Sequence, residues 1–457
     1  MCSFLFSTCN VAAGNRFNVY MKRRGPDETN TISFRGHTYV HNLLSITGSK
    51  TSQPVFSEDI GCVFNGEIYN VPDVSSAGSE VEALIEAYNR LGTGMFSHLD
   101  GEFAVVIVDY KKNIAVISSD CFGTKPIWAG FAQGEFACAS YASALKALGF
   151  KDIRKVKANE TWVVSLVDWC VVRKQEVVQF NLNQFKESYD DWIYSFEEAI
   201  KKRVKGLQHK LFVCVSSGYD SGAITCELER QSTNFKAFIF PENENSDVLE
   251  SRISRFEKQR IPFALFEFNR KTFAMAKKNF EDKCEDYEYD GYRVRNEGAG
   301  VGLAHMFQHA RDEGFKIMLS GQGADEILSD YGMGGKKLYW HSELGGVFPQ
   351  DLSKVFPWPN VFGRMQERYL AKEECIAGAF GIETRYPFLD KKVVQEFLNL
   401  SSKLKNKNYK APIHQYLSEK KYPFEANSKR GFAPDLRVKS GVLVQARQRV
   451  RNWLREL

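Results

Sequence analysis

A run of small and hydroxyl-bearing residues at 216–222 carries the most specific chemical pattern in the chain. Its sequence, SSGYDSG, directly follows the apolar stretch Leu211–Val215 and precedes a helix-like segment at 223–230. Backbone N–H groups and serine hydroxyls at such a strand-to-helix turn can close on a phosphate, aided by the helix dipole. The same residue types are ordinary in turns, so the run alone leaves both interpretations open. The candidates for phosphate binding are Ser216, Ser217, Gly218, Asp220 and Ser221.

Residues 320–326 form a second loop of the same kind, with the sequence SGQGADE after the apolar run Lys316–Leu319. Two glycine-rich acidic loops at the carboxyl ends of strands in one sheet favour a shared ligand site. Asp220 and Asp325 are expected to share Mg²⁺, because this ion prefers hard oxygen ligands and substrate phosphates. The second loop adds three residues to the binding candidates: Ser320, Gly321 and Asp325.

The cysteine at position 2 suggests a different kind of chemistry. If Met1 is removed, Cys2 carries a thiol and a free α-amine on one residue. An amine with a pKa near ~8 can accept the thiol proton, which is an N-terminal nucleophile arrangement. A cysteine at this position is on its own weak support for catalysis.

The elements that would position these groups differ between the two parts of the chain. Up to about residue 180, short β runs alternate with turns, as at Gly61–Phe64, Phe103–Asp109 and Ile114–Ser118, and few helices interrupt them. Ser79–Leu91 is the clearest helix. This pattern predicts a sheet-rich α+β sandwich domain over residues 1–185.

Beyond a predicted helix at Tyr189–Val204, strands and helices alternate. Alternation of this kind favours a doubly wound α/β domain with a parallel sheet over residues 186–457, and its ligand at the carboxyl ends of the strands. The expected buried strands are apolar runs of suitable length: Leu211–Val215, Lys236–Phe240, Phe263–Phe268 and Lys316–Leu319.

Composition narrows the class of protein further. The 61 basic and 56 acidic residues among 457 leave a net charge of +5, which gives no reason to expect nucleic acid or a membrane as partner. The sequence contains neither a membrane-spanning apolar run nor a signal peptide pattern, which favours a cytoplasmic protein. The ten cysteines include no CxxC pair, so reduced thiols are expected in place of a zinc site.

Four segments of the second half resemble motifs of the asparagine synthetase family. This resemblance implies ATP and Mg²⁺ as cofactors, activation of a carboxylate as an acyl-adenylate, and attack by a nitrogen nucleophile. Lys429 would be the catalytic lysine, since a charged lysine can stabilise the negative charge that gathers at phosphorus. The segments are residues 217–221, similar to SGGxDS; 320–326, similar to SGEGADE; 381–390, similar to GxEARVPFLD; and 428–432, similar to RxKxGF.

The first half resembles the glutaminase domain of the same family, a domain with an N-terminal nucleophile. The resemblance implies that Cys2 is the nucleophile, that Asn65 and Gly66 form the oxyanion hole, and that ammonia from glutamine travels through the protein to the adenylate. The matching segments are residues 24–27 (RGPD), 65–70 (NGEIYN), 100–104 (DGEFA) and 120–126 (DCFGTKP).

Three positions depart from the family pattern. Leu43 stands where an Arg binds the glutamine α-carboxylate, and Glu80 stands where an Asp holds the α-amine. Loss of such charge-assisted hydrogen bonds costs about 1.5 to 3 kcal/mol, so weak binding of free glutamine is expected. Gln322 replaces a Glu that can accept a proton, which an amide cannot do. The chain is thus interpreted as a divergent paralogue.

Three functions follow from these patterns. The first is a glutamine-dependent amidotransferase, favoured by Cys2, with glutamine or ammonia and a small-molecule carboxylate as substrates. The second is an ATP-dependent amide synthetase, similar to β-lactam synthetases or peptide cyclases, with a degenerate glutaminase domain. The third, a silent scaffold, is disfavoured because Asp220, Asp325 and Lys429 are present. The identity of the carboxylate and the oligomeric state stay open, a homodimer included.

Overall fold

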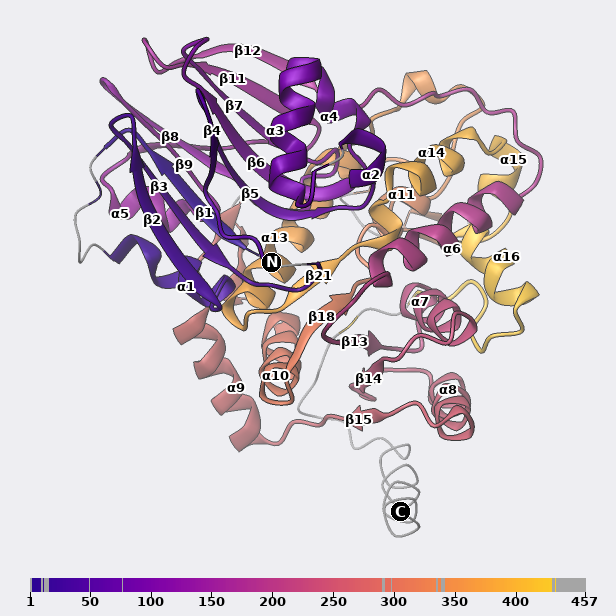
Figure 1. The fold of residues 1–457 in the computed structure, drawn as a ribbon. Coiled ribbons are helices and arrows are strands. Elements are labelled where there is room, and N and C mark those ends of the chain that lie inside the picture. The colour runs from indigo at the N-terminus through magenta and orange to yellow at the C-terminus, as the bar shows by residue number, and fades with distance from the viewer. Residues whose placement is uncertain are drawn as a thin grey trace.

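The protein folds into two parts that lie against each other, as the computed structural model shows (Figure 1). The amino-terminal part is rich in antiparallel strands, and the carboxyl-terminal part surrounds a parallel sheet with helices. The described residues are 2–9, 11, 16–48, 50–75, 77–289, 292–296, 298–333, 336–337, 342–429 and 432.

The amino-terminal domain is a sandwich of two six-stranded antiparallel sheets. One sheet has the order β10-β8-β9-β1-β3-β2 and the other the order β12-β11-β7-β6-β5-β4. Alternate side chains of both sheets meet in one core that contains Phe4, Phe6, Val106 and Ile117, which is how a sandwich buries its inner faces. The strands are β1 (Ser3–Ser7), β2 (Glu28–Phe34), β3 (His37–Leu43), β4 (Val55–Ser57), β5 (Ile60–Ile68), β6 (Gly101–Asp109), β7 (Ile114–Ser119), β8 (Trp128–Ala132), β9 (Glu135–Ala139), β10 (Asp152–Lys155), β11 (Glu160–Ser165) and β12 (Val171–Glu176).

Helices of this domain are few, as the sequence predicts. The longest is α3 (Glu80–Leu91), and it begins where the Ser79 hydroxyl accepts a hydrogen bond from the backbone N–H of Glu82. The others are α1 (Val19–Arg24), α2 (Val71–Val74), α4 (Met95–His98) and α5 (Ala142–Ala147).

The carboxyl-terminal domain contains a five-stranded parallel sheet in the order β15-β14-β13-β18-β21. The chain builds outward from β13 to β15 and then returns to the other side of β13, so the direction of winding changes between β13 and β18. A crevice at such a switch point is where ligands bind in this fold. The strands are β13 (Lys210–Val215), β14 (Lys236–Ile239), β15 (Phe263–Leu265), β18 (Phe315–Leu319) and β21 (Glu383–Arg385).

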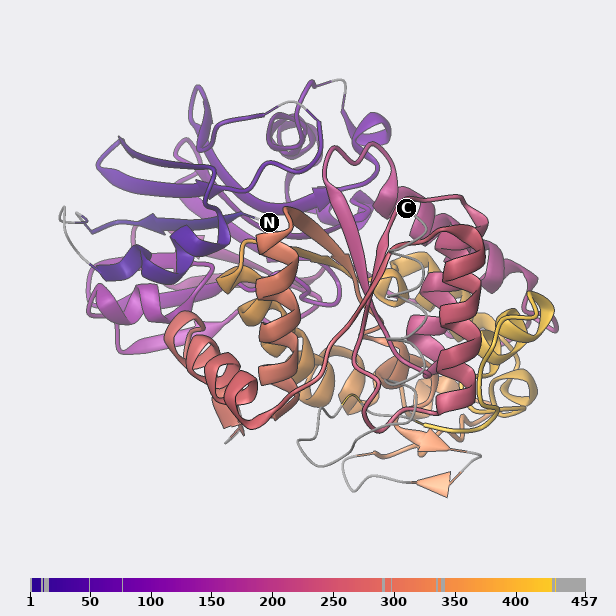
Figure 2. The ribbon, with the colours of Figure 1, turned by 90° about the horizontal axis from the view of Figure 1, so that it is seen from below.

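Helices cover both faces of this sheet, and Figure 2 shows α9 and α10 on one side and α8 on the other. The predicted doubly wound class is therefore confirmed. The helices are α6 (Asp190–Val204), α7 (Tyr219–Arg230), α8 (Ser246–Gln259), α9 (Arg270–Lys283), α10 (Gly298–Asp312), α11 (Ala324–Leu328), α12 (Pro359–Phe362), α13 (Arg364–Ala379), α14 (Lys391–Asn399), α15 (Ser402–Lys405) and α16 (Ala411–Glu419), with two short hairpins, β16 (Glu288–Tyr289) with β17 (Tyr292–Arg293) and β19 (Gly332–Met333) with β20 (Lys336–Lys337).

Two predicted element limits are wrong. The strand expected to reach Phe268 ends at Leu265, because its only partner, β14, ends at Ile239 and the two last residues face each other. The helix expected from residue 223 begins at Tyr219, so Asp220 lies in its first turn, where the helix dipole favours an acidic side chain. The predicted domain boundary near residue 185 lies between β12 and α6 and stays a prediction.

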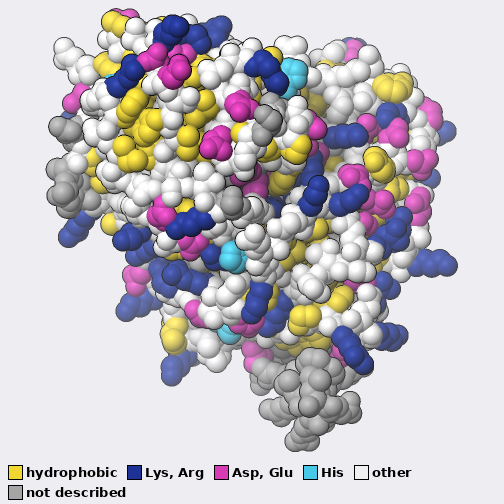
Figure 3. Space-filling view, viewed as in Figure 1, with side chains coloured by type: hydrophobic (Ala, Val, Ile, Leu, Met, Phe, Trp, Pro, Cys, Tyr) yellow, Lys and Arg dark blue, Asp and Glu magenta, His cyan; other side chains and the backbone are white. Residues whose placement is uncertain are grey.

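Charged side chains of both signs are interspersed over the face drawn in Figure 3, consistent with the small net charge. Among the described residues, no helix combines the length and the apolar character that a bilayer crossing requires.

Candidate active sites and the contact between them

The two glycine-rich loops of the carboxyl-terminal domain meet at one cavity of about 310 Å³. The cavity lies at the carboxyl ends of β13 and β18, where the sequence predicts the ligand. The first loop is held by its own serines: the Ser221 hydroxyl accepts from the backbone N–H of Ser216 at 3.1 Å, and the Ser216 hydroxyl accepts from that of Gly218 at 3.1 Å. The predicted residues that line this cavity are Ser216, Asp220, Ser221, Ser320, Gly321, Asp325 and Lys429.

Ser217 and Gly218 are in the loop but do not line the cavity. The Ser217 hydroxyl and backbone N–H both donate to Glu244, the latter at 2.6 Å. Gly218 is the residue that immediately precedes α7. Both therefore shape the loop from outside the cavity.

A buried lysine that the sequence motifs do not include joins the two loops. Lys410, 2% exposed, places its Nζ 2.7 Å from both carboxylate oxygens of Asp220 and 3.0 Å from Oδ1 of Asp325. Lys429 Nζ lies 2.6 Å from the same Asp325 oxygen. Two carboxylates and two ammonium groups thus meet at one side of the cavity, where Asp220, Asp325 and Lys429 line it and Lys410 contacts both carboxylates without lining it. Lys410 is 190 residues from Asp220 in the sequence, so no local spacing could have indicated it.

Burial and these charges act in opposite directions on the two carboxyl groups. Burial alone would raise the pKa of Asp325, but the charges of Lys410 and Lys429 more than offset it and hold that pKa well below its usual range. Burial raises the pKa of Asp220, and the neighbouring Asp325 adds to the rise. The ammonium group of Lys410 thus lies between the oxygens of the two carboxylates, and binding of Mg²⁺ by this pair stays a prediction.

The second candidate site surrounds Cys2 at the start of β1. The thiol is nearly buried and lies 3.9 Å from the carbonyl oxygen of Leu44. Burial raises the pKa of the Cys2 thiol to about 11. Arg24 Nε donates to the Cys2 carbonyl oxygen at 2.9 Å and so fixes the backbone next to the thiol. A thiol with so high a pKa needs a nearby base, which agrees with a role for a free α-amine.

Asn65 and Gly66, the predicted oxyanion residues, lie near the end of β5. The Asn65 side chain is fully buried, and neither of its polar atoms has a hydrogen-bond partner among the described residues. A buried amide without partners costs free energy, so it indicates a position that a ligand completes. Gly66 has φ of 140°, and a Cβ there would lie 1.9 Å from the carbonyl oxygen of Glu102, so only glycine fits.

The pocket next to Cys2 is lined by three carboxylates and three cationic side chains, the latter being Lys202, Lys205 and Arg385. Leu43 and Glu80 line it together with Glu67, Glu383 and Arg385. One Glu80 oxygen accepts from the backbone N–H of Ile68 at 2.6 Å, and burial, with the charge of Glu67, raises the pKa of Glu80 well above its usual range. Among the residues that the structure describes, no arginine of the amino-terminal domain lines the pocket, and the arginine that does, Arg385, belongs to the other domain.

Strand β21 of the carboxyl-terminal domain forms one wall of this pocket. Arg385 Nη2 lies 2.9 Å from Glu67 across the domain contact, and its Nε donates to Glu383 at 2.7 Å. β21 also pairs with β18, and the backbone N–H of Ser320 in the second glycine-rich loop donates to the Arg385 carbonyl oxygen at 2.9 Å, so this strand connects the two sites. Residues 381–390 resemble a motif of the family, but the motif does not predict that this segment lines the pocket next to Cys2.

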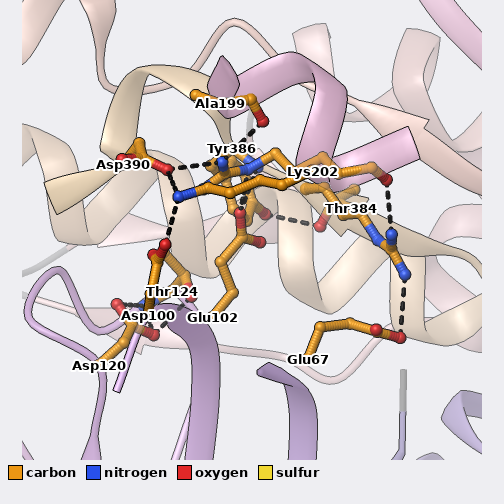
Figure 4. Close-up of polar contacts among 12 residues, drawn as sticks. Glu67, Asp100, Glu102, Asp120, Thr124, Ala199, Lys202, Thr384, Tyr386 and Asp390 are labelled. Atoms are coloured by element: carbon orange, nitrogen blue, oxygen red, sulfur yellow. Dashed lines mark hydrogen bonds and ion pairs between the residues drawn. The ribbon is translucent and has the colours of Figure 1, made fainter. Parts of the chain in front are cut away.

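One partly buried and one fully buried ion pair join the domains around this strand. Lys202 of α6 pairs with Asp100 at 2.6 Å and with Asp390, and Figure 4 shows both carboxylates pointing toward its amine. Arg203 pairs with Glu102 at 2.8 Å across the contact. Pairs of this kind require an exact fit of both domains, because a buried charge without its partner is costly.

Glu374 of α13 is the centre of a second group of such pairs. It pairs with Arg24, with Lys125 at 3.0 Å, and accepts from the Thr384 hydroxyl at 2.6 Å. Lys125 belongs to the DCFGTKP segment and Arg24 to the RGPD segment. These two amino-terminal motifs therefore anchor the thiol site to the carboxyl-terminal domain.

Replacing Arg24 by Met is expected to lower the free energy of unfolding by about 3 to 5 kcal/mol, because it leaves Glu374 buried without one of its cations. Urea denaturation measures this change. The control is Arg35→Met, which breaks an exposed pair with Asp59 and should cost at most about 1 kcal/mol. Equal losses in both variants would contradict the assigned role of the Arg24 pair.

Comparison with known proteins agrees with this architecture. Residues 6–189 match the model of a glutamine amidotransferase domain, and residues 193–373 and 361–456 match that of asparagine synthase. The chain is 27% identical over 413 residues to a protein of Methanocaldococcus jannaschii assigned as glutamine-hydrolysing asparagine synthetase 1, covering 81% of this chain and 71% of the relative. It is 25% identical over 419 residues to glutamine-hydrolysing asparagine synthetase 1 of Arabidopsis thaliana, covering 84% and 66%.

An amidotransferase domain joined to a parallel-sheet synthetase domain defines the class of ATP-dependent carbon–nitrogen ligases of the amidotransferase type. The chain belongs to the asparagine synthase family. Its identity to the curated relatives is low and it spans about two thirds of their length, which agrees with a divergent paralogue.

Proposed function

We propose that the protein is a glutamine-dependent amidotransferase, which activates a substrate carboxylate with ATP and converts it to an amide with ammonia from glutamine. The observation that supports this most is the position of Asp220, Asp325 and Lys429 along one cavity between the two loops, with Lys410 in contact with both carboxylates. Ammonium groups next to a loop that can bind phosphates suit a reaction in which negative charge develops at phosphorus.

We assign roles to the first glycine-rich loop, to the two lysines and to the two aspartates. The loop Ser216–Gly222 binds the phosphates, while Lys429 and Lys410 stabilise the negative charge of the reacting phosphorus centre. Asp220 and Asp325 would hold Mg²⁺, which supplies additional positive charge to the phosphates when it is bound. Loss of pyrophosphate then leaves the carboxylate as an acyl-adenylate.

In the amino-terminal domain, Cys2 attacks the amide of the nitrogen donor after Met1 is removed. Asn65 and the backbone at Gly66 donate hydrogen bonds to the oxyanion that forms. The unpartnered Asn65 amide supports this role, since a buried donor gains a partner only in the reacting complex.

A second candidate function is an ATP-dependent amide synthetase whose glutaminase domain is degenerate. Leu43 favours it, because an apolar side chain at this place in the pocket cannot pair with the α-carboxylate of glutamine. Pyrophosphate release is to be measured with L-aspartate, L-glutamate and their N-acyl derivatives, with and without glutamine. Stimulation by glutamine supports the amidotransferase, and release without such stimulation supports the second candidate.

Replacing Leu43 by Arg is expected to lower the KM for glutamine about tenfold or more, because it restores a charge-assisted contact of about 1.5 to 3 kcal/mol. Leu43 ends β3 and lines the pocket, so the new side chain faces the bound donor. Steady-state glutaminase kinetics measure the change. Leu91→Arg, at an exposed position outside the pocket, should leave KM unchanged. An unchanged KM in Leu43→Arg would mean that this pocket does not receive an α-carboxylate.

A further inference from the structure

The carboxylate of Glu373 faces Gln322, the residue that stands where the family has a glutamate able to accept a proton. Glu373 of α13 is 3% exposed and lines the same cavity as Asp325 and Lys429. Gln322 Nε2 donates to Oε2 of Glu373 at 3.4 Å, so the amide of the loop orients the carboxylate of the helix. The two side chains thus meet inside the cavity although they are 51 residues apart in the sequence.

The other carboxylate oxygen, Oε1 of Glu373, is buried and has no hydrogen-bond partner of good geometry among the described residues, although the Ser320 hydroxyl is close enough to the carboxylate to favour its ionised form. The neighbouring Glu374 differs in this respect, since its oxygens are used by Arg24, Lys125 and Thr384 at the domain contact. Burial of an acceptor without a partner is costly, and such an atom inside a ligand cavity indicates a partner that arrives with the substrate.

We propose that Glu373 is the general base that takes the proton from the attacking nitrogen. This inference rests on the proposed carboxylate activation. The nitrogen lone pair forms the bond to the acyl carbon, one N–H proton passes to a Glu373 oxygen, and the bond from carbon to the phosphate oxygen breaks. The products are the amide and AMP, and the proton stays on Glu373 until it passes to solvent. Gln322 positions the carboxylate and takes no proton.

The protonation equilibrium of Glu373 suits this task. Burial raises the pKa of Glu373 to about 7, the charge of Glu374 adds to the rise, and Ser320, Gln322 and Lys372 oppose it. A base with a pKa near the working pH combines a useful ionised fraction with sufficient proton affinity. The titratable groups near it are Lys372 and Glu374 on its own helix, Cys214 on β13 and Tyr386 after β21. The same cavity is also lined by Asp220, Asp325, Glu326, Tyr331, Tyr369 and Lys429.

The test separates the two half-reactions in the full-length protein, using the acid that gives the fastest exchange of pyrophosphate into ATP among L-aspartate, L-glutamate and their N-acyl derivatives. In Glu373→Gln, amide formation from ammonia should fall at least about 10²-fold more than exchange does, as is typical for loss of a general base. Glu367→Gln, on the same helix but paired with Lys155 at 2.9 Å outside the cavity, is the matched control and should change neither rate.

A rescue variant adds a readout that a structural role would not produce. Glu373→Gln combined with Gln322→Glu returns a carboxylate to the cavity from the loop and should recover at least about tenfold of the lost amide formation. At a fixed concentration of unprotonated ammonia, the wild-type rate should rise with pH through about 7, because the base must be ionised, and this rise should vanish in Glu373→Gln.

Three results would overturn the assignment. Equal losses of exchange and amide formation would make Glu373 a structural or binding residue. Unchanged amide formation in Glu373→Gln would exclude it as the base. If the wild type shows no acid-dependent exchange with any of the acids, the proposed function itself fails and the role of Glu373 fails with it. If the wild type shows acid-dependent exchange but Glu373→Gln loses no more amide formation than exchange, the role of Glu373 is wrong while the proposed function stands.

Discussion

Replacing Asp325 by Ala is expected to lower the exchange of pyrophosphate into ATP at least about 10²-fold, and Asp220→Ala should do the same. Asp325 pairs with Lys410 and Lys429 and accepts a hydrogen bond from the Tyr409 hydroxyl, so its removal takes away the carboxylate that holds Lys429 in the cavity and Lys410 next to it. Removing a single preorganised charge or donor at a reacting centre has an effect of this size. Exchange of labelled pyrophosphate in the presence of a carboxylic acid measures it.

The control for this experiment is Asp282→Ala, which removes an exposed carboxylate of α9 on the surface of the same domain. It should retain full exchange. Circular dichroism and the midpoint of thermal unfolding establish that each variant is folded. Full exchange in both cavity variants would show that nucleotide chemistry takes place elsewhere in the chain.

Replacing Cys2 by Ala is expected to abolish glutamine hydrolysis while synthesis with added ammonia continues. The thiol is the proposed nucleophile, and the alanine variant retains the rest of the pocket, including the unpartnered Asn65 amide. Hydrolysis in the wild type should become measurable only at high glutamine, because Leu43 and Glu80 replace the groups that bind the free amino acid. Release of glutamate and formation of the amide product are measured separately.

Cys170→Ala is the control for the thiol, because Cys170 is exposed and does not line the pocket. Its glutaminase rate should equal that of the wild type. If wild-type protein shows no Cys2-dependent hydrolysis at any glutamine concentration, the amide synthetase with a degenerate amino-terminal domain becomes the better description. The nitrogen would then come from another amine.

The sequence by itself determined the type of both domains and the position of the two glycine-rich loops. The reason is that these features are local: an apolar run of four to five residues followed by small and acidic residues produces a strand, a tight turn and a helix wherever it occurs. The sequence also shows directly that Leu43, Glu80 and Gln322 differ from the residues of the family motifs, because each is read from a single position. The end of β15 at Leu265 was not visible, because the length of β14 decides it.

Only the tertiary structure shows that Lys410 lies between Asp220 and Asp325. It also shows that Glu373 faces Gln322. In the amino-terminal site, it places Glu383 and Arg385 next to Cys2. These contacts join segments that are far apart in the chain. A lysine or glutamate on a helix has the same local pattern whether it faces solvent or a cavity, and its surroundings are set by packing of other elements against it. The loops are therefore encoded locally, whereas the charges that would make them reactive depend on how the domains pack.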